Sequence, residues 1–211
     1  MLKYETTAAN KGYRFVIGVD EAGRGPLAGP VVAGAVLFPP QVSLNGLDDS
    51  KKLSQKSREK FFPRIIQTAL AYGVGVVSVE TIERINILQA ALLAMKQAVE
   101  KCALPPDLLL IDGNKRVDHP ADQWTIVGGD GKSLSIAAAS VLAKVTRDRI
   151  MREYHKNYPE YEFDRHKGYP TQLHREKLRQ FGPCPIHRKT FKGVKETETA
   201  YHRPENPPNP L

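Results

Sequence analysis

The sequence predicts an α/β fold in which a mixed, five-stranded central sheet is flanked by helices. Five short runs are rich in β-branched, aromatic and aliphatic residues, as strands are, and apolar residues recur at helical spacing in longer segments between and after them. The first two strand-like runs follow each other without a helix between them, and later runs alternate with helices. This order favours a sheet of mixed direction with helices packed on it.

The expected strands cover residues 13–19, 31–38, 71–79, 108–111 and 124–127. A helix is expected over residues 54–70, with Ser54 as its N-cap. The clearest helix covers residues 80–101, where apolar residues recur at helical spacing and the pattern ends before a Pro-Pro pair. A third helix, from residue 133 to about 154, is apolar at its start and increasingly basic toward its end.

The length of 211 residues favours one domain, which we place over residues 1–195. Its last part, about 155–195, mixes aromatic and basic residues and is expected to form a C-terminal helical appendage. Residues 196–211 contain several prolines and few apolar residues, a composition typical of a disordered tail.

Composition excludes several classes of protein. No apolar run approaches the ~20 residues that cross a bilayer, and residues 1–10 lack the apolar core of a secretory signal, so we expect a cytoplasmic protein without a membrane partner. Cys102 and Cys184 are far apart and have no CxxC partner, which supports neither a disulfide framework nor a thiolate zinc site.

Positive charge is concentrated in one part of the chain. The formal net charge is +8, and residues 144–195 contain 14 Lys/Arg against 6 Asp/Glu. A cationic segment joined to a nearly neutral one with an acidic cluster indicates a polyanion that one part holds and the other processes. A solvated basic surface without a ligand explains the charge equally well at this point.

Four acidic residues stand at predicted strand ends or in a glycine-rich turn: Asp20, Glu21, Asp112 and Asp130. Strand ends on one edge of a sheet can converge, and clustered carboxylates repel each other unless hard divalent cations bind them. Two such ions could activate a water and stabilise the leaving oxygen of a phosphodiester. Taken singly, Asp112 and Asp130 are better explained as turn residues, because Gly113 and Gly131 follow them and Asp-Gly is also a hairpin signal.

A short phosphate-binding pattern follows the first two acids. Gly23 and Gly25 would let backbone N–H groups approach a ligand, and Arg24 between them offers a planar fork for phosphate. The triplet alone is common in proteins and predicts little without its context.

Five ordered blocks together closely resemble bacterial ribonuclease HII, from about residue 13 to 190. The blocks read DEAGRGPLAGPV (20–31), DSKKL (49–53), LIDG (110–113), AAASVLAKVTRD (137–148) and HKGYPT (166–171). The resemblance implies a ribonuclease H-like fold and a metal-dependent endonuclease that cleaves the RNA strand of RNA/DNA hybrids. It also implies nicking of DNA duplexes 5′ of an embedded ribonucleotide, with two Mn²⁺ or Mg²⁺ ions in the catalytic complex. Nothing in the sequence demands more than a monomer.

The resemblance also assigns residues. The metal-binding carboxylates fall on Asp20, Glu21, Asp112 and Asp130, with Asp148 as a competing acid for the last position. Gly23, Arg24 and Gly25 match the triplet whose backbone reads the ribose 2′-hydroxyl, and Tyr169 matches the aromatic residue that stacks on the adjacent deoxyribose. The resemblance further implies a phosphate contact for Lys51, and places Ser140 and Lys144 along the same groove. Other polar residues in or next to these blocks are expected to be solvated surface or general electrostatic contacts: Lys52, Arg147, Arg165, His166 and Lys167.

Two other functions compete with this hypothesis. A non-catalytic nucleic-acid-binding protein would explain the basic segment but not the four acids. A DNA-specific nuclease or integrase-like enzyme on the same fold would explain the acids, but it would have no use for the sugar-sensing triplet and Tyr169.

Overall fold

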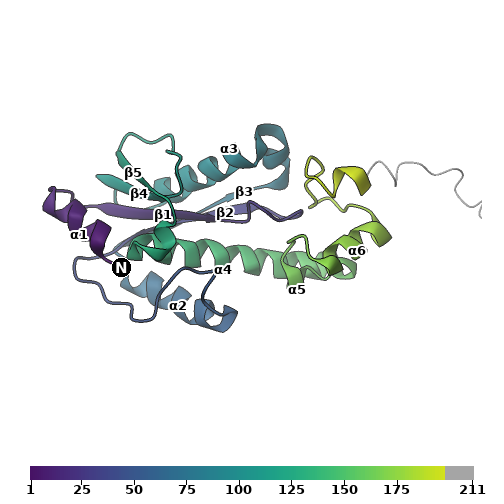
Figure 1. Cartoon of the computed structure of the whole chain (residues 1–211), viewed down its shortest axis with the longest axis horizontal. Helices are drawn as coiled ribbons and strands as arrows, with labels where there is room; N and C mark the ends of the chain where they lie inside the picture. Colours follow the sequence, from purple (N-terminus) through teal and green to yellow (C-terminus); the bar gives the residue numbers. More distant parts are fainter. Residues whose placement is uncertain (198–211) are drawn as a thin grey trace, which may run out of the picture. The chain divides into compact units, whose positions relative to one another are not determined.

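The computed structural model describes residues 1–197, which divide into two compact units (Figure 1). The core unit contains Met1–Arg24 and Pro30–Arg147, and the C-terminal unit contains Gly25–Gly29 and the chain from Asp148 onward. Most of the tail that was predicted to be disordered, residues 198–211, lies outside the described residues.

The core unit is built on a five-stranded mixed sheet in the order β3-β2-β1-β4-β5, which confirms the predicted class. Its strands are β1 (Val16–Ala22), β2 (Val31–Leu37), β3 (Ala71–Val77), β4 (Leu108–Asp112) and β5 (Asp122–Ile126). Antiparallel pairing joins β1 to β2 and β2 to β3, whereas β4 is parallel to both β1 and β5. The first strand starts three residues later than predicted and extends through both acids at its end.

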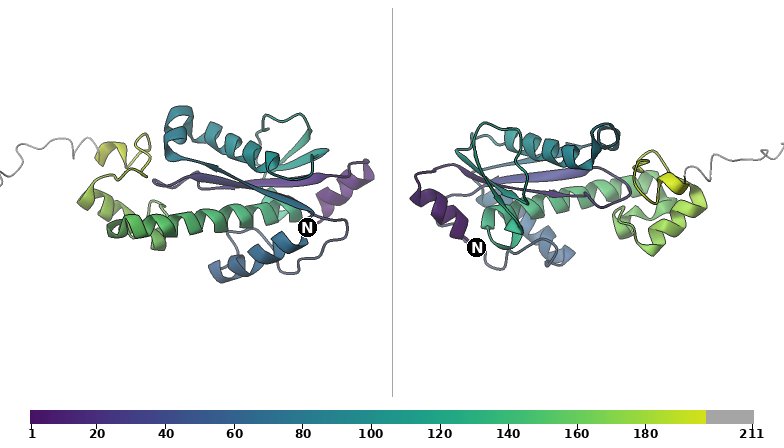
Figure 2. Two further views of the ribbon diagram at one scale, coloured as in Figure 1. Left: turned by 180° about the vertical axis from the view of Figure 1, so that it is seen from behind. Right: turned by 45° about the horizontal axis from the view of Figure 1, so that its top comes forward.

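Helices cover both faces of this sheet. Figures 1 and 2 show α3 (Val79–Glu100) on one face, and α2 (Gln55–Thr68) with α4 (Leu134–Asn157) on the other. Ser54 caps α2 as predicted, since its hydroxyl accepts a hydrogen bond from the Ser57 N–H. The sequence did not predict α1 (Lys3–Asn10), which buries only Ala8 and therefore has little apolar periodicity. Among the helices of residues 1–197, none is long and apolar enough to cross a bilayer.

Glycines let the helices approach the sheet closely. A Cβ on Gly34 of β2 would stand 2.4 Å from the Ala139 carbonyl oxygen of α4, and one on Gly75 of β3 would stand 2.0 Å from the Ala94 carbonyl oxygen of α3. Both positions therefore exclude any larger residue. Gly34 pairs with Asp20 across the β1–β2 ladder, so the close packing of α4 lies next to the predicted site.

The C-terminal unit combines the end of α4 with η2 (Pro159–Tyr161), α5 (Phe163–His166) and α6 (Gln172–Phe181). Its main apolar cluster includes Ala28, Met151, Phe163 and Ile186. The segment Gly25–Gly29 is held in this unit by backbone contacts: the Leu27 N–H donates to the Gly168 carbonyl, and Ala28 forms an antiparallel bridge with His187. The expected helical appendage is thus completed by a segment from far earlier in the chain.

Candidate active site

Three carboxylates converge at one edge of the core sheet. The parallel register aligns Val19 of β1 with Ile111 of β4, so the next residues, Asp20 and Asp112, stand side by side. Asp130 lies in the short helix η1 (Gly129–Gly131), which follows β5. Ligand oxygens of the three side chains lie within 4.8 Å of one another. The structure thus brings together three of the four predicted acids, and Asp148 is not a member of this group.

Burial makes this group electrostatically costly. Asp20 is 4% exposed and Asp130 is 5% exposed. Burial and then the charges of Glu21, Asp112 and Asp130 raise the pKa of Asp20 well above its ordinary value. Burial and the charge of Asp130 also raise the pKa of Asp112. A divalent cation among these oxygens would relieve both the desolvation and the repulsion.

The end of β4 and the turn that carries Asp130 are tied together. Asp112 Oδ1 accepts a 2.7 Å hydrogen bond from the Gly129 N–H. A Cβ on Gly129 would meet Ile136 Cδ1 at 2.6 Å, so a larger residue there would displace the end of the Ile136 side chain. Asp130 and Gly131 do not form a hairpin, because their turn leads from β5 into α4.

Glu21 lies beside Arg24 and is not a member of the three-aspartate group, although its charge acts on Asp20. Successive strand residues point to opposite faces, so Asp20 and Glu21 diverge. Glu21 Oε1 accepts a 3.2 Å hydrogen bond from Arg24 Nη1. Burial raises the pKa of Glu21, although Arg24 opposes this shift. Both side chains line a cavity of about 70 Å³ together with Leu88, Leu92 and Met95 of α3 and with Asp112.

Lys51 contacts the aspartate group from the loop before α2. Its ammonium Nζ lies 3.0 Å from Asp130 Oδ2. Burial would lower the pKa of Lys51, but the hydrogen bond and the charge of Asp130, with smaller effects of Asp49 and Asp20, raise it overall. Lys51 therefore supplies positive charge to the acidic group.

Ser140 and Lys144 lie one turn apart on α4. The Ser140 hydroxyl is buried, donates to the Ala137 carbonyl at 2.8 Å and accepts from the Ser50 N–H at 3.4 Å. It thereby fastens the loop that carries Lys51. Lys144 is half-buried. A substrate contact of either residue stays a prediction.

The structure constrains the two glycines of the 23–25 triplet differently. Gly23 has a φ of +102°, and a Cβ there would stand 2.2 Å from Arg147 Nε. Arg147 is fully buried and donates to the Pro30 carbonyl at 3.0 Å, so its assignment to solvated surface was wrong. Gly25 has no left-handed φ, and within residues 1–197 nothing lies within 4 Å of a Cβ built on it. Local geometry therefore requires glycine at residue 23 but not at residue 25.

Tyr169 is 37% exposed and lies in a tight turn of the C-terminal unit. Its N–H donates to the His166 carbonyl at 2.9 Å, and the preceding Gly168 has a φ of +82°. His166 and Lys167 are buried, which corrects their assignment to solvated surface. The His166 ring is bonded to the Tyr161 carbonyl and the Gly168 N–H, contacts that the polar HKGY pattern does not indicate.

Sequence reasoning missed Arg188, which is fully buried in the C-terminal unit. Its guanidinium donates to the carbonyls of Gly29 at 2.7 Å and of Pro26 at 2.8 Å, and it lies 5.0 Å from the centre of the Phe191 ring. It fixes the segment that continues the glycine triplet. No pattern in a single sequence distinguishes such a buried arginine from the surface cations around it.

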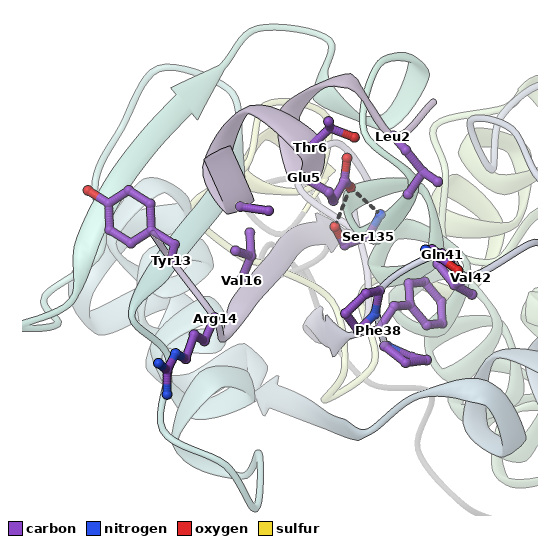
Figure 3. A pocket seen from close by; sticks show the side chains of 13 residues that line it. Leu2, Glu5, Thr6, Tyr13, Arg14, Val16, Phe38, Gln41, Val42 and Ser135 are labelled. Atoms are coloured by element: carbon purple, nitrogen blue, oxygen red, sulfur yellow. Dashed lines mark hydrogen bonds between the residues drawn. The ribbon is translucent and has the colours of Figure 1, made fainter. Parts of the chain in front are cut away.

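A larger cavity of about 420 Å³ lies at the start of β1 (Figure 3). Leu2, Val16, Phe38 and Val42 give it an apolar lining, and Glu5 from α1 accepts a hydrogen bond from the Ser135 N–H at its border (Figure 3). It contains none of the predicted site residues, which lie at the other end of β1 and beyond.

Comparison with known proteins identifies the family. The model of the family described as Ribonuclease HII matches residues 17–194. The chain belongs to the ribonuclease HII family. The ribonuclease HII of Syntrophotalea carbinolica is 54% identical over 195 residues, 92% of this chain and 93% of that protein. That of Geobacter sulfurreducens is 56% identical over 193 residues, 92% of this chain and 89% of that protein.

Solved structures agree with this assignment. Ribonuclease H2 from Pyrococcus horikoshii superposes with a TM-score of 0.74 at 27% identity, covering 90% of this chain and all of that chain. Bst-RNase HIII in complex with Mn²⁺ shares the fold, with a TM-score of 0.65 at 18% identity, covering 88% of this chain and 70% of that chain. The fold is ribonuclease H-like, as predicted. The activity is that of a ribonuclease H, a hydrolase of nucleic acid in a family that requires a divalent metal.

Proposed function

We propose that the protein cleaves the RNA strand of RNA/DNA hybrids and nicks DNA duplexes on the 5′ side of an embedded ribonucleotide, leaving 3′-hydroxyl and 5′-phosphate ends. The buried group of Asp20, Asp112 and Asp130 carries this proposal, because three carboxylates within 4.8 Å call for bound cations. Membership of the ribonuclease HII family supports the substrate class.

The donors fit divalent Mg²⁺ or Mn²⁺, since all are carboxylate oxygens and no sulfur or nitrogen ligand is among them. Asp20, Asp112 and Asp130 would hold the ions, with Glu21 contributing from the opposite face of β1. When bound, a pair of such ions supplies a water of lowered pKa and stabilises the leaving oxygen. No side-chain nucleophile is needed.

Lys51 is proposed to contact a phosphate near the cut. Its side chain is 78% exposed although its ammonium touches the 7% exposed carboxylate of Asp130. The same lysine can therefore leave Asp130 for a substrate phosphate once cation charge balances that carboxylate. In the free protein it limits the repulsion within the aspartate group.

Sugar recognition is assigned to the glycine triplet and Tyr169. Gly25 has open space where a side chain would stand, so the close approach of a ribose is the remaining reason for glycine there. Backbone groups of residues 23–25 would read the 2′-hydroxyl, the group that distinguishes RNA from DNA. The exposed ring of Tyr169 would stack on the neighbouring deoxyribose.

The proposal is tested with two end-labelled DNA duplexes that differ by one ribonucleotide, each incubated with Mg²⁺ or Mn²⁺ and mapped to the nucleotide. We expect one nick 5′ of the ribonucleotide, absent from the all-DNA duplex and absent in EDTA. Equal cutting of both duplexes would indicate a DNA nuclease, and binding without cutting would contradict the assigned chemistry.

A further inference from the structure

Three histidines are buried together in the C-terminal unit, and the chemistry proposed above uses none of them. His166 is 7% exposed, His174 is fully buried and His187 is 1% exposed. The rings of His166 and His174 are stacked with centroids 4.3 Å apart, and those of His174 and His187 are 5.3 Å apart. Burying three imidazoles is costly unless each ring nitrogen has a hydrogen-bond partner.

Hydrogen bonds connect these rings to the backbone of Tyr169. His174 Nδ1 lies 3.0 Å from the Tyr169 carbonyl oxygen, and His174 Nε2 lies 3.1 Å from His187 Nε2. At the outer end, His187 Nδ1 accepts from the Cys184 N–H at 3.0 Å. We call this chain, from Cys184 through His187 and His174 to Tyr169, the imidazole relay.

One arrangement of protons satisfies the whole relay. The Tyr169 carbonyl only accepts, so His174 Nδ1 carries hydrogen, and Nε2 of the neutral ring accepts from His187 Nε2–H. His187 Nδ1 is then an acceptor, which matches the Cys184 N–H that points at it. Burial and the neighbouring imidazoles lower the pKa of His174 to about 4 and of His187 to about 3, which keeps both rings neutral.

The third histidine holds the other side of the same turn. His166 Nδ1 accepts from the Gly168 N–H at 3.1 Å, and its Nε2 donates to the Tyr161 carbonyl at 2.8 Å. The His166 carbonyl accepts from the Tyr169 N–H. The backbone of Tyr169 is thus held at its N–H by His166 and at its carbonyl by His174, with a further 2.8 Å bond from the Thr171 N–H.

The pattern does not suit a metal ion. Each ring nitrogen of His166, His174 and His187 already has a partner within the C-terminal unit. A neutral imidazole binds metal through a free lone pair, and none is left here. The imidazole relay therefore holds backbone groups in place, and the last of these is the Tyr169 carbonyl.

We propose that His174 and His187 are positioning residues for ribonucleotide recognition, which hold the Tyr169 backbone so that its ring is presented to the sugar in one orientation. This inference rests on the proposed function, since it requires Tyr169 to contact the substrate. A fixed backbone position of Tyr169 matters because a stacking ring displaced by about 1 Å from its productive position loses much of its effect on the reaction.

The test is a double-mutant cycle on cleavage at a single embedded ribonucleotide. His174→Leu removes the donor to the Tyr169 carbonyl, and His174→Asn keeps an N–H at the position of Nδ1. We expect His174→Leu to lower kcat/KM roughly tenfold, as one lost buried hydrogen bond does, and His174→Asn to recover most of that loss. In a Tyr169→Ala background, His174→Leu should cause no further loss.

The other possible results distinguish failure of this inference from failure of the proposed sugar recognition. If His174→Leu causes the same loss with and without Tyr169, the histidine serves general stability and the inference is wrong. If Tyr169→Ala impairs cleavage but neither histidine variant does, only the inference fails. If Tyr169→Ala leaves cleavage at the embedded ribonucleotide unchanged, the proposed sugar recognition is wrong, and the inference is wrong with it.

A second pair of variants keeps the inference testable if His174→Leu does not fold. His187→Gln keeps an N–H near the position of Nε2, which faces His174, whereas His187→Asn keeps only the acceptor for the Cys184 N–H. Circular dichroism first shows that both variants are folded. His187→Gln should then retain a higher kcat/KM than His187→Asn for cleavage at the embedded ribonucleotide. Equal activity of the two, or the reverse order, would overturn the relay.

Discussion

At the scale of single residues, Asp20 is the carboxylate whose burial and like-charged neighbours cost the folded protein the most free energy. It is almost fully buried beside two other carboxylates, and Lys51 contacts Asp130 rather than Asp20. Such a residue destabilises the metal-free fold, and a strongly perturbed carboxyl of this kind is typical of a functional site.

Asp20→Asn should lower turnover at an embedded ribonucleotide by more than about a hundredfold, because loss of a ligand exceeds the 10- to 100-fold effect typical of a lost outer-shell partner. Duplex affinity, measured by fluorescence anisotropy, should stay close to that of the wild type. Residual cleavage near the wild-type rate would show that Asp20 is not a ligand.

The same substitution should stabilise the protein in EDTA. Because the pKa of folded Asp20 is raised above its ordinary value of 3.8, the folded state retains its proton longer than the unfolded state does. Its contribution to the free energy of unfolding is therefore intact below about pH 4 and is lost as the pH rises through the raised value. Urea unfolding in EDTA should show a gap between Asp20→Asn and wild type that widens from pH 4 to 7; a constant gap would contradict the shift.

Single-sequence reasoning identified the acids because each stands at a strand end or in a turn that composition reveals. It could not separate Asp20 from Glu21 by side-chain direction without knowing which face of β1 meets α4. It also placed Arg147 and His166 on the surface, since burial of a polar residue depends on partners distant in the sequence.

At the scale of elements, β1 and the turn after it position the site. β1 places Asp20 beside Asp112 through its parallel register with β4, and the left-handed backbone at Gly23 lies against buried Arg147. The left-handed φ and the absence of space at Gly23 together make this turn intolerant of a side chain.

Gly23→Ala should therefore lower the free energy of unfolding by roughly 1–3 kcal/mol, through backbone strain and displacement of Arg147. Gly25→Ala is the matched control, because its Cβ meets open space and its stability should stay near wild type. Chemical denaturation of both variants checks this, and equal losses would contradict the two separate reasons for glycine.

Element boundaries followed from local signals where a cap or an apolar period marks them, as for α2. The kink in α3 did not follow from any local signal in the sequence. Asn86 has a φ of 68° and its side-chain oxygen accepts from the N–H groups of Leu88 and Gln89, so it starts a second helical segment inside a continuous apolar pattern. Apolar periodicity alone cannot show a kink that preserves the buried face.

At the scale of the whole molecule, the acids and the bulk of the positive charge belong to different parts of the chain. The core unit contains the aspartate group, and residues 144–195 carry 14 Lys/Arg against 6 Asp/Glu. The sequence predicted this division of charge. It could not predict that Gly25–Gly29 would pack in the C-terminal unit, because pairing with residues near 168 and 187 leaves no local pattern.

Binding of a duplex should weaken steeply with salt, because each phosphate neutralised by Lys or Arg releases condensed counterions. With roughly five phosphate contacts, affinity should fall about a hundredfold or more between 50 and 200 mM salt. Anisotropy titrations with the Asp20→Asn variant measure this without turnover. An affinity that does not change with salt would show that the basic residues of 144–195 do not bind the duplex through its phosphates.

The central claim is that Asp20, Asp112 and Asp130 form a site for divalent cations, and thermal unfolding with and without Mn²⁺ tests it most directly. We predict that Mn²⁺ raises the Tm of the wild type, and that Asp112→Asn has a higher Tm than wild type in EDTA but loses the response to Mn²⁺. An equal Mn²⁺ response in wild type and Asp112→Asn, or a wild-type Tm that Mn²⁺ leaves unchanged, would contradict the claim.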